Sequence, residues 1–282
     1  MREIQNRKKA APPIVLMNFT HVYEEESFWK KEPHLWIDCT DLSGVNGYCD
    51  EAAAAEIRKR IESLPPEGLH FIDSGNFHYL SRFWTDKIQR DFVLILFDHH
   101  TDMQRSRFGD ILSCGSWVRD VLEKNPHARR AVLAGVGEEY LRGLEPAWRE
   151  RVAGLTCSAF ELESTWKCFA DTNLEGEYGT LPIYISIDKD VLSPGEEVTD
   201  WDQGEMSLDT LKELLRIMIR THEIIGADIC GECRGLLGQS LSAIQKNDSV
   251  NDQLTRFLKQ EVVKKEGNPA KQAGDLQNGA VK

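Results

Sequence analysis

Two clusters of ionisable side chains, one of which includes histidines, follow apolar segments of the chain. Asp98-His99-His100-Thr101-Asp102 comes directly after Phe92–Phe97, and Asp188-Lys189-Asp190 comes directly after Ile183–Ile187. In extended chain, residues two apart point to the same side, so alternate residues of each cluster are expected to converge. His78 follows a third apolar run. The sequence therefore predicts six candidate metal ligands: His78, Asp98, His100, Asp102, Asp188 and Asp190.

The four carboxylates in this set indicate a divalent cation. Packed together without one, they would repel each other, raise each other's pKa and destabilise the fold. Carboxylate and imidazole donors without a thiolate suit Mn²⁺ better than a structural zinc site, and six ligands can bridge two ions. A single Asp after a strand is usually a turn or capping residue, and a single His is usually a partly buried histidine. Two such clusters favour metal binding.

The segments that must position these side chains alternate between strand-like and helix-like patterns. Short Val-, Ile-, Leu- and Phe-rich runs predict strands buried on both faces. They are Ile14–Phe19, Leu35–Asp38, Leu69–Asp73, Phe92–Phe97, Ala131–Val136, Ile183–Ile187 and Ile224–Ile229. Helices are expected at Glu51–Leu64, Gly115–Lys124, Glu138–Arg151 and Leu208–Arg220. The alternation predicts an α/β protein with a parallel sheet, whose strand ends form the usual binding crevice.

Composition excludes several classes of protein. The 282 residues include 46 acidic and 34 basic ones, so 34 − 46 gives a formal net charge of −12. This balance argues against a nucleic-acid surface and mildly favours cationic partners. No apolar run approaches the roughly 18 residues that a membrane-spanning helix needs. The seven cysteines are scattered and odd in number, which does not indicate a secreted disulfide framework.

The two ends of the chain carry little that could be buried. Met1–Pro13 has no apolar stretch of the kind found in a signal peptide, so we expect a soluble, cytoplasmic protein with reduced cysteines. Residues 264–282 are polar, with Gly, Pro, Asn and Gln. We expect this tail to be disordered and residues 1–263 to form one domain.

At these residues the chain resembles the arginase/agmatinase family, the ureohydrolases. The family's Asp-x-His-x-Asp motif is matched at Asp98–Asp102, and its Ser-x-Asp-x-Asp-x-x-x-Pro motif at Ser186–Pro194. Its Gly-Gly-Asp-His motif is matched in part by Gly75-Asn76-Phe77-His78, and Thr199–Ser207 resembles a glycine-containing loop before a late helix. The resemblance implies an arginase-like fold: a single-domain, three-layer α-β-α structure with a central, mostly parallel sheet.

The resemblance also implies a distribution of the ligands over two manganese ions. Asp98 and Asp188 would bridge both ions. One ion would be held by His78, Asp98, Asp102 and Asp188, and the other by His100, Asp98, Asp188 and Asp190.

Glu232 resembles the family's acidic residue that pairs with the guanidinium group of the substrate. It lies four positions after Asp228, whereas the family's spacing is three. Gly231 could absorb the extra residue as a bulge. An exposed glutamate without a catalytic role is the alternative.

A cysteine stands where the family places a proton-shuttling histidine. The chain has Cys114 in the sequence Leu112-Ser113-Cys114-Gly115-Ser116. A thiol has an unperturbed pKa of about 8.5 and is a poorer proton shuttle near neutral pH. Cys114 and Glu232 are therefore the candidate catalytic residues, with protonation of the leaving group differing from that in the family.

Two further groups of residues could have a functional role or none. Arg105 and Arg107 could contact an anionic end of the substrate or could be solvated loop charges. Cys230 and Cys233 have C-x-x-C spacing. A redox or zinc role would need a thioredoxin-like helix or a second Cys/His pair, and the sequence shows neither.

The resemblance leads to one functional hypothesis and two alternatives. The hypothesis is a dimanganese hydrolase of linear amidines, in which a metal-bridging hydroxide cleaves a C–N bond of a small, cationic guanidino or related amidino compound. A homo-oligomer would be compatible with it, and neither nucleic acid nor membrane is expected as a partner. The alternatives are a catalytically weak member of the family that binds metal and a ligand, and a related metal-dependent amide hydrolase.

Overall fold

The computed structural model describes residues 13–106, 109–156, 178–234 and 240–266. Its centre is an eight-stranded sheet in the order β2-β1-β4-β10-β9-β5-β7-β8, in which every pairing is parallel. The strands are β1 Ile14–Asn18, β2 His34–Asp38, β4 Gly68–Phe71, β5 Phe92–Phe97, β7 Ala128–Ala134, β8 Val152–Leu155, β9 Ile183–Asp188 and β10 Ile224–Cys230. All seven predicted strands are present.

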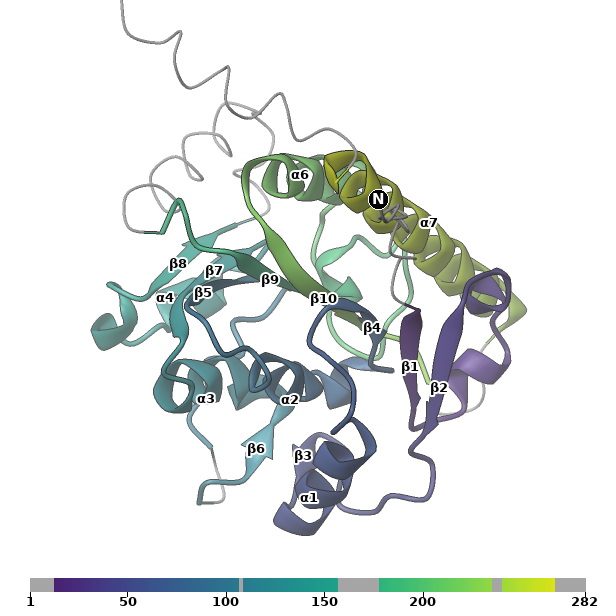
Figure 1. The fold of residues 1–282 in the computed structure, drawn as a ribbon, viewed down its shortest axis with the longest axis horizontal. Helices are drawn as coiled ribbons and strands as arrows, with labels where there is room; N and C mark the ends of the chain where they lie inside the picture. Colours follow the sequence, from purple (N-terminus) through teal and green to yellow (C-terminus); the bar gives the residue numbers. More distant parts are fainter. Residues whose placement is uncertain (1–12, 107–108, 157–177, 235–239, 267–282) are drawn as a thin grey trace, which may run out of the picture.

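Helices cover both faces of this sheet (Figure 1). Helices α1 (Glu51–Arg60), α2 (Leu80–Thr85) and α3 (Trp117–Lys124) lie along one face, and α6 (Leu208–Thr221) and α7 (Leu241–Glu266) lie along the other. Successive side chains of a strand point to opposite faces, so each strand serves two apolar cores. On β5, for example, Leu94 and Leu96 pack in one core while Val93, Ile95 and Phe97 pack in the other. The predicted three-layer α-β-α arrangement is confirmed.

Capping residues start two of the predicted helices. The Asp50 side chain accepts a hydrogen bond from the Ala53 amide at 2.8 Å, and the Ser207 side chain accepts one from the Thr210 amide at 3.1 Å. Each satisfies a backbone donor in the first turn, which has no partner within the helix.

The helix predicted over Glu138–Arg151 is wrong in its length. Helix α4 spans only Glu138–Arg142, and a short 3-10 turn, η5, follows at Pro146–Trp148. Gly143 and Pro146 explain the break, because proline lacks an amide donor and is poorly tolerated inside a helix.

Short elements lie outside the main sheet and follow the carboxyl ends of several strands. Strands β3 (Tyr48–Cys49) and β6 (Leu112–Ser113) pair antiparallel in a small second sheet. Three 3-10 turns, η3 (Gly75–Phe77), η4 (Cys114–Ser116) and η7 (Lys189–Val191), follow the ends of β4, β6 and β9.

At the far end of the chain, helix α7 continues to Glu266. The boundary predicted at residue 263 therefore falls inside a helix, and residues 267–282 of the predicted tail lie outside the described residues.

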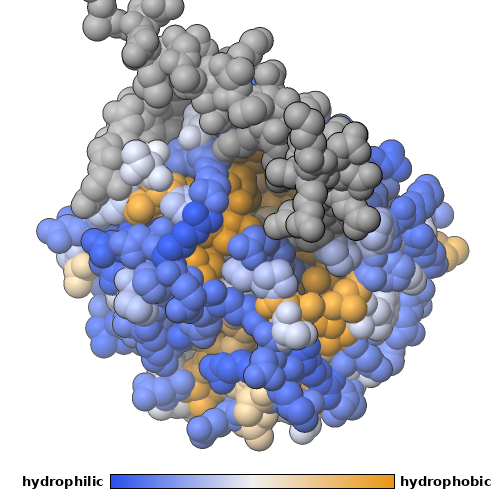
Figure 2. Space-filling view, viewed as in Figure 1, coloured by the Kyte–Doolittle hydropathy of each residue, from blue (hydrophilic) through white to orange (hydrophobic). Residues whose placement is uncertain are grey.

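Hydrophilic residues cover most of the described surface on the face in Figure 2. Across the described ranges, no helix combines the length and the apolar character needed to cross a membrane.

Candidate metal centre

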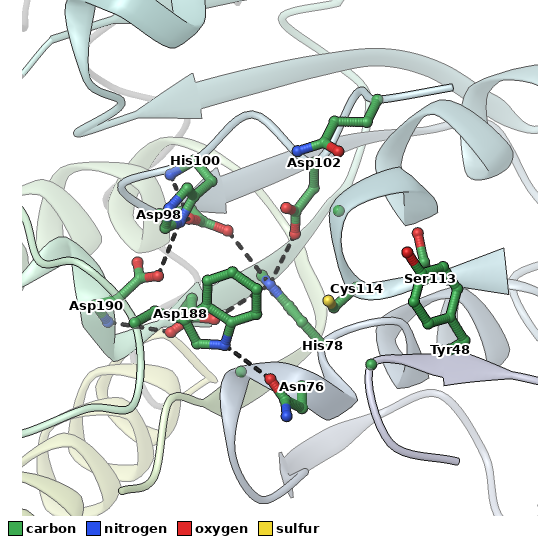
Figure 3. A pocket seen from close by; sticks show the side chains of 15 residues that line it. Tyr48, Asn76, His78, Asp98, His100, Asp102, Ser113, Cys114, Asp188 and Asp190 are labelled. Carbon is green, nitrogen blue, oxygen red and sulfur yellow. Dashed lines mark hydrogen bonds and ion pairs between the residues drawn. The ribbon is translucent and has the colours of Figure 1, made fainter. Parts of the chain in front are cut away.

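The carboxyl ends of β4, β5 and β9 bring the predicted ligands to one cavity. The cavity has a volume of about 520 Å³. All six predicted ligands line it, and Figure 3 shows them facing one another, with Cys114 beside His78 and with Ser113 and Tyr48 farther from the group. The remaining described lining residues are Gly47, Gly75, Asn76, Gln104, Gly115 and Trp201.

Three carboxylates surround one nitrogen of His78. The distances from His78 Nδ1 are 3.3 Å to Asp98 Oδ2, 3.0 Å to Asp102 Oδ2 and 3.4 Å to Asp188 Oδ2. All four side chains are almost completely buried. Donor atoms this close together can contact one ion, and their types suit a divalent cation.

A second cluster lies beside the first and shares Asp98 with it. His100 Nδ1 lies 3.0 Å from Asp190 Oδ2 and 3.4 Å from Asp98 Oδ1. Asp98 therefore presents Oδ2 to the first cluster and Oδ1 to the second, as a bridging carboxylate would. Asp188 presents Oδ2 to the first cluster, and its Oδ1 accepts a hydrogen bond from the Asp190 amide at 3.0 Å, just as Asp98 Oδ1 accepts one from the His100 amide.

The electrostatics of this cluster favour a cation. Burial, together with the neighbouring carboxylate of Asp190, raises the pKa of Asp188 to about 7. Burial and Asp98 raise the pKa of Asp190 to about 6. Burial opposes the charged form of His100, but its hydrogen bonds to Asp190 and Asp98 raise its pKa above the usual value. Without a metal, these carboxylates thus bind protons at a higher pH than usual, and a divalent cation would displace those protons.

In both histidines, the ring nitrogen that faces away from the carboxylate cluster, Nε2, lies within hydrogen-bonding distance of another side chain. His78 Nε2 lies 2.9 Å from Ser186 Oγ, and the Ser186 hydroxyl donates to Asp228 Oδ1 at 2.6 Å. His100 Nε2 lies 3.1 Å from Asp202 Oδ1. Such contacts fix the orientation and tautomer of a metal-binding imidazole and leave Nδ1 available. The sequence did not indicate this role for Ser186, Asp202 or Asp228, although Ser186 is part of a quoted motif.

The structure adds a sulfur atom to the first cluster. Cys230 Sγ lies 3.2 Å from Asp188 Oδ2, and the potential ligand atoms of Cys230, Asp188 and His78 lie within 4.8 Å of one another. The sequence predicted a donor set without sulfur, whereas the structure places a thiol beside these donors. The missed signal is the alternation along β10, which places Cys230 on the same side as Asp228.

Cys114 lies at the cavity, as the sequence predicts. Its side chain is partly buried at the start of η4. Burial, with the nearby Asp102 carboxylate, raises the pKa of the Cys114 thiol to about 12. Near neutral pH this side chain therefore remains a protonated thiol.

Glu232, in contrast, does not reach the cavity. Gly231 has a φ of 99° and turns the chain at the end of β10, so that Glu232 is completely buried beside α7. There its carboxylate lies 2.6 Å from Lys189 Nζ and accepts a hydrogen bond from Asn251 Nδ2 at 2.8 Å. The structure therefore does not support the predicted pairing of Glu232 with a substrate, and we revise that role.

The structure also describes parts of the other two predicted motifs. Arg105 pairs with Glu145 Oε2 at 2.7 Å on the surface, and Arg107 is outside the described residues. Cys230 and Cys233 are not joined by a disulfide, and Cys233 Sγ lies 3.4 Å from Asp200 Oδ1.

Comparison with known proteins identifies the family. A model of the arginase family matches residues 67–234, a range that includes all six predicted ligands. The chain belongs to the arginase family. An uncharacterized protein of Thermotoga maritima is 32% identical over 223 residues, which cover 78% of this chain and 80% of that protein.

Solved structures share the arginase-family fold at low sequence identity. Proclavaminate amidino hydrolase from Streptomyces clavuligerus has a TM-score of 0.63 at 14% identity, over 88% of this chain and 92% of that one. Formimidoylglutamase from Bacillus subtilis has a TM-score of 0.63 at 14% identity, over 89% and 87%. Agmatine ureohydrolase of Thermoplasma volcanium has a TM-score of 0.61 at 12% identity, over 90% and 89%. At these identities the likeness establishes the fold.

Proposed function

We propose that this arginase-family protein is a two-metal hydrolase that cleaves a C–N bond of a small amidino compound. The observation that carries the proposal is the sharing of Asp98 between two donor clusters, through two different carboxylate oxygens. Two bound divalent ions would supply a water of lowered pKa and would stabilise negative charge on the reacting group. The relatives named above as amidino hydrolase and ureohydrolase support the reaction class.

The proposed ligand sets follow the two clusters. His78, Asp98, Asp102 and Asp188 would hold one ion, and His100, Asp98 and Asp190 the other. The donors of the His100 cluster are nitrogen and oxygen atoms, which suit Mn²⁺.

The walls of the cavity suit a small planar cation. Among the described residues that line it, none is Lys or Arg. Trp201 is partly exposed at the cavity, and its indole donates to Asn76 Oδ1 at 3.0 Å, which fixes the ring. An amidinium group can be attracted to such an aromatic face. With Glu232 turned away, we propose that the aromatic wall and the carboxylate cluster orient the substrate.

Two observations favour a second candidate function. The Cys114 thiol is held in its neutral form, and Glu232 is engaged by Lys189. A family member with these features could bind metal and a ligand with weak catalysis, or could hydrolyse an amide whose leaving group needs a different proton donor.

Product analysis of the manganese-loaded protein separates these candidates. We expect turnover among guanidino, formimino and acetylated amines, with urea, formamide and acetate measured separately. Urea or formamide would support the proposal, acetate would favour an amide hydrolase, and no product from any substrate would favour the binding protein.

Metal content tests the centre itself. We expect close to two ions per chain by elemental analysis, and a marked loss in Asp98→Ala because this carboxylate serves both clusters. Asp209→Ala is the matched control, since the Asp209 side chain is 99% exposed on α6. Full two-metal occupancy in Asp98→Ala would contradict the assignment.

A further inference from the structure

We propose that Cys230 is a ligand of the ion held by the His78 cluster, and that its sulfur makes this position selective for a softer ion of the zinc or ferrous class over Mn²⁺. The inference rests on the proposed metal centre and concerns one of its two positions. The His100 position keeps donors of nitrogen and oxygen alone, so the two positions would differ in the metal they prefer.

The distances fit a thiolate ligand. A zinc ion bound at about 2.3 Å to sulfur and about 2.1 Å to oxygen in tetrahedral geometry separates these two atoms by about 3.6 Å. Cys230 Sγ and Asp188 Oδ2 lie 3.2 Å apart. Asp188 Oδ2 lies 3.4 Å from His78 Nδ1, so the three donors already surround one point. A small expansion of this triangle would accommodate an ion.

The register of the sheet holds the sulfur in this place. On neighbouring strands, Cys230 of β10 is paired with Asp188 of β9, and Asp228 is paired with Ser186. Side chains two apart share a face, so Cys230 and Asp188 lie together at the carboxyl edge, next to the pair that orients His78. These are strand positions in the centre of the sheet, which makes the arrangement rigid.

Gly231 allows the end of β10 to approach Asp188 closely, next to the contact between Cys230 and Asp188. A Cβ atom at this residue would lie 2.6 Å from Asp188 Oδ1 and 2.7 Å from the Lys189 amide nitrogen. Glycine therefore allows the end of β10 to lie directly against the Asp188 carboxylate.

The second thiol at the site provides a matched control. Cys114 lines the cavity, yet among the described residues it belongs to none of the three groups of potential ligands. A sulfur signal from the metal should therefore depend on Cys230 and not on Cys114.

Cobalt substitution tests this assignment without measuring activity. We load the full chain with Co²⁺, measure the bound metal by elemental analysis and record the near-ultraviolet spectrum for a thiolate-to-cobalt charge-transfer band. We expect the band in the wild type and in Cys114→Ser, and its loss in Cys230→Ser and Cys230→Ala. Bound cobalt without this band in the wild type would overturn the inference, and so would a band that disappears in Cys114→Ser but persists in the Cys230 variants.

Affinity measurements then test the selectivity. By titration calorimetry, Cys230→Ser should lose at least about tenfold in Zn²⁺ affinity while Mn²⁺ affinity changes little, because serine replaces the soft donor by a hard one. Equal losses for both ions, or no loss for Zn²⁺, would also overturn the inference. Cobalt bound without the band would contradict the role of Cys230 but not the proposed function. A wild type that binds no divalent ion would contradict both proposals. The wild-type spectrum is decisive even if the Cys230 variants do not fold.

Discussion

At the scale of single residues, the site depends on which nitrogen of His78 carries the proton. The Ser186 hydroxyl donates to Asp228 Oδ1, so its oxygen is left to accept from His78 Nε2–H. That assignment leaves the lone pair of Nδ1 facing the carboxylate cluster, where a cation would bind. Ser186 would thus act on a bound ion through His78, without contacting the ion.

Ser186→Ala should weaken metal binding by about 10- to 100-fold, because His78 would lose the partner that fixes its tautomer. Titration calorimetry with Mn²⁺ on the folded variant measures this loss. Ser81→Ala is the control, since the Ser81 hydroxyl also donates to Asp228 Oδ1, at 3.0 Å, whereas its hydrogen bond to His78 runs from the backbone amide to the backbone carbonyl and is kept in the variant. Equal affinities for Ser186→Ala and the wild type would show that the tautomer is fixed by other contacts.

The sequence predicted part of this site, for a physical reason. The six candidate ligands sit in short motifs at strand ends, where local spacing determines which way a side chain points. Cys230 and Glu232 depend instead on how β10 meets its neighbours and on a single backbone turn at Gly231. Spacing along one strand shows that Cys230 shares a face with Asp228, but not that β10 lies beside β9. The sequence therefore did not indicate the contact of Cys230 with Asp188 or the burial of Glu232.

At the scale of elements, a buried ionic network joins the loop after β9 to helix α7. Lys189 lies between two proposed ligands, but its side chain points to the opposite side of the sheet, where it is completely buried. Its ammonium group lies 2.6 Å from Glu232 and 3.0 Å from Glu197, and it donates to Asn251 of α7. The network fixes η7, which follows Asp188 and contains Asp190.

Glu197 should make the stability of the protein depend on pH. Burial, with the nearby Glu232, raises the pKa of Glu197 to about 8, even though Lys189 acts in the opposite direction. The folded state therefore holds this proton more tightly than the unfolded state, whose pKa is near the ordinary 4.5. The stabilisation is fully present below that value and is lost as the pH rises through about 8, with a slope of at most about 1.4 kcal/mol per pH unit.

Urea unfolding between about pH 5 and pH 8.5 measures this effect as the difference between variants. Glu197→Gln keeps the shape of the side chain but cannot ionise, so its curve should lack the decline. The exposed Glu205→Gln should follow the wild type. Parallel curves for the wild type and Glu197→Gln would contradict the raised pKa.

The same network explains why helix α7 was not predicted from the sequence. Its buried side includes Asn247 and Asn251 as well as Val250, Leu254 and Leu258. The two asparagines interrupt the apolar periodicity that predicts an amphipathic helix. They are buried because both donate hydrogen bonds to Glu232. The central strands, in contrast, could be predicted, because a strand buried on both faces is apolar throughout.

At the scale of the whole molecule, the order of the strands assembles the site. Strand β9 lies between β5 and β10 in the sheet, although these three strands are far apart in the sequence. The proposed ligands at 78, at 98–102 and at 188–190 therefore meet only when the sheet has formed. An unfolded chain cannot hold them at one point, so a divalent ion should bind the folded state alone.

This exclusive binding predicts a stability that depends on metal concentration. At a free metal concentration about a hundred times the dissociation constant, the folded state gains about 2.7 kcal/mol. For a chain of this size that gain corresponds to a rise of about 5 to 10 °C in Tm. We expect the rise on adding Mn²⁺ and its reversal by a chelator in thermal unfolding followed by circular dichroism. Asp98→Asn should unfold at nearly the same temperature with and without metal, because it loses the shared carboxylate. A wild-type Tm that neither Mn²⁺ nor the chelator changes would mean that the clustered carboxylates do not form a tight manganese site.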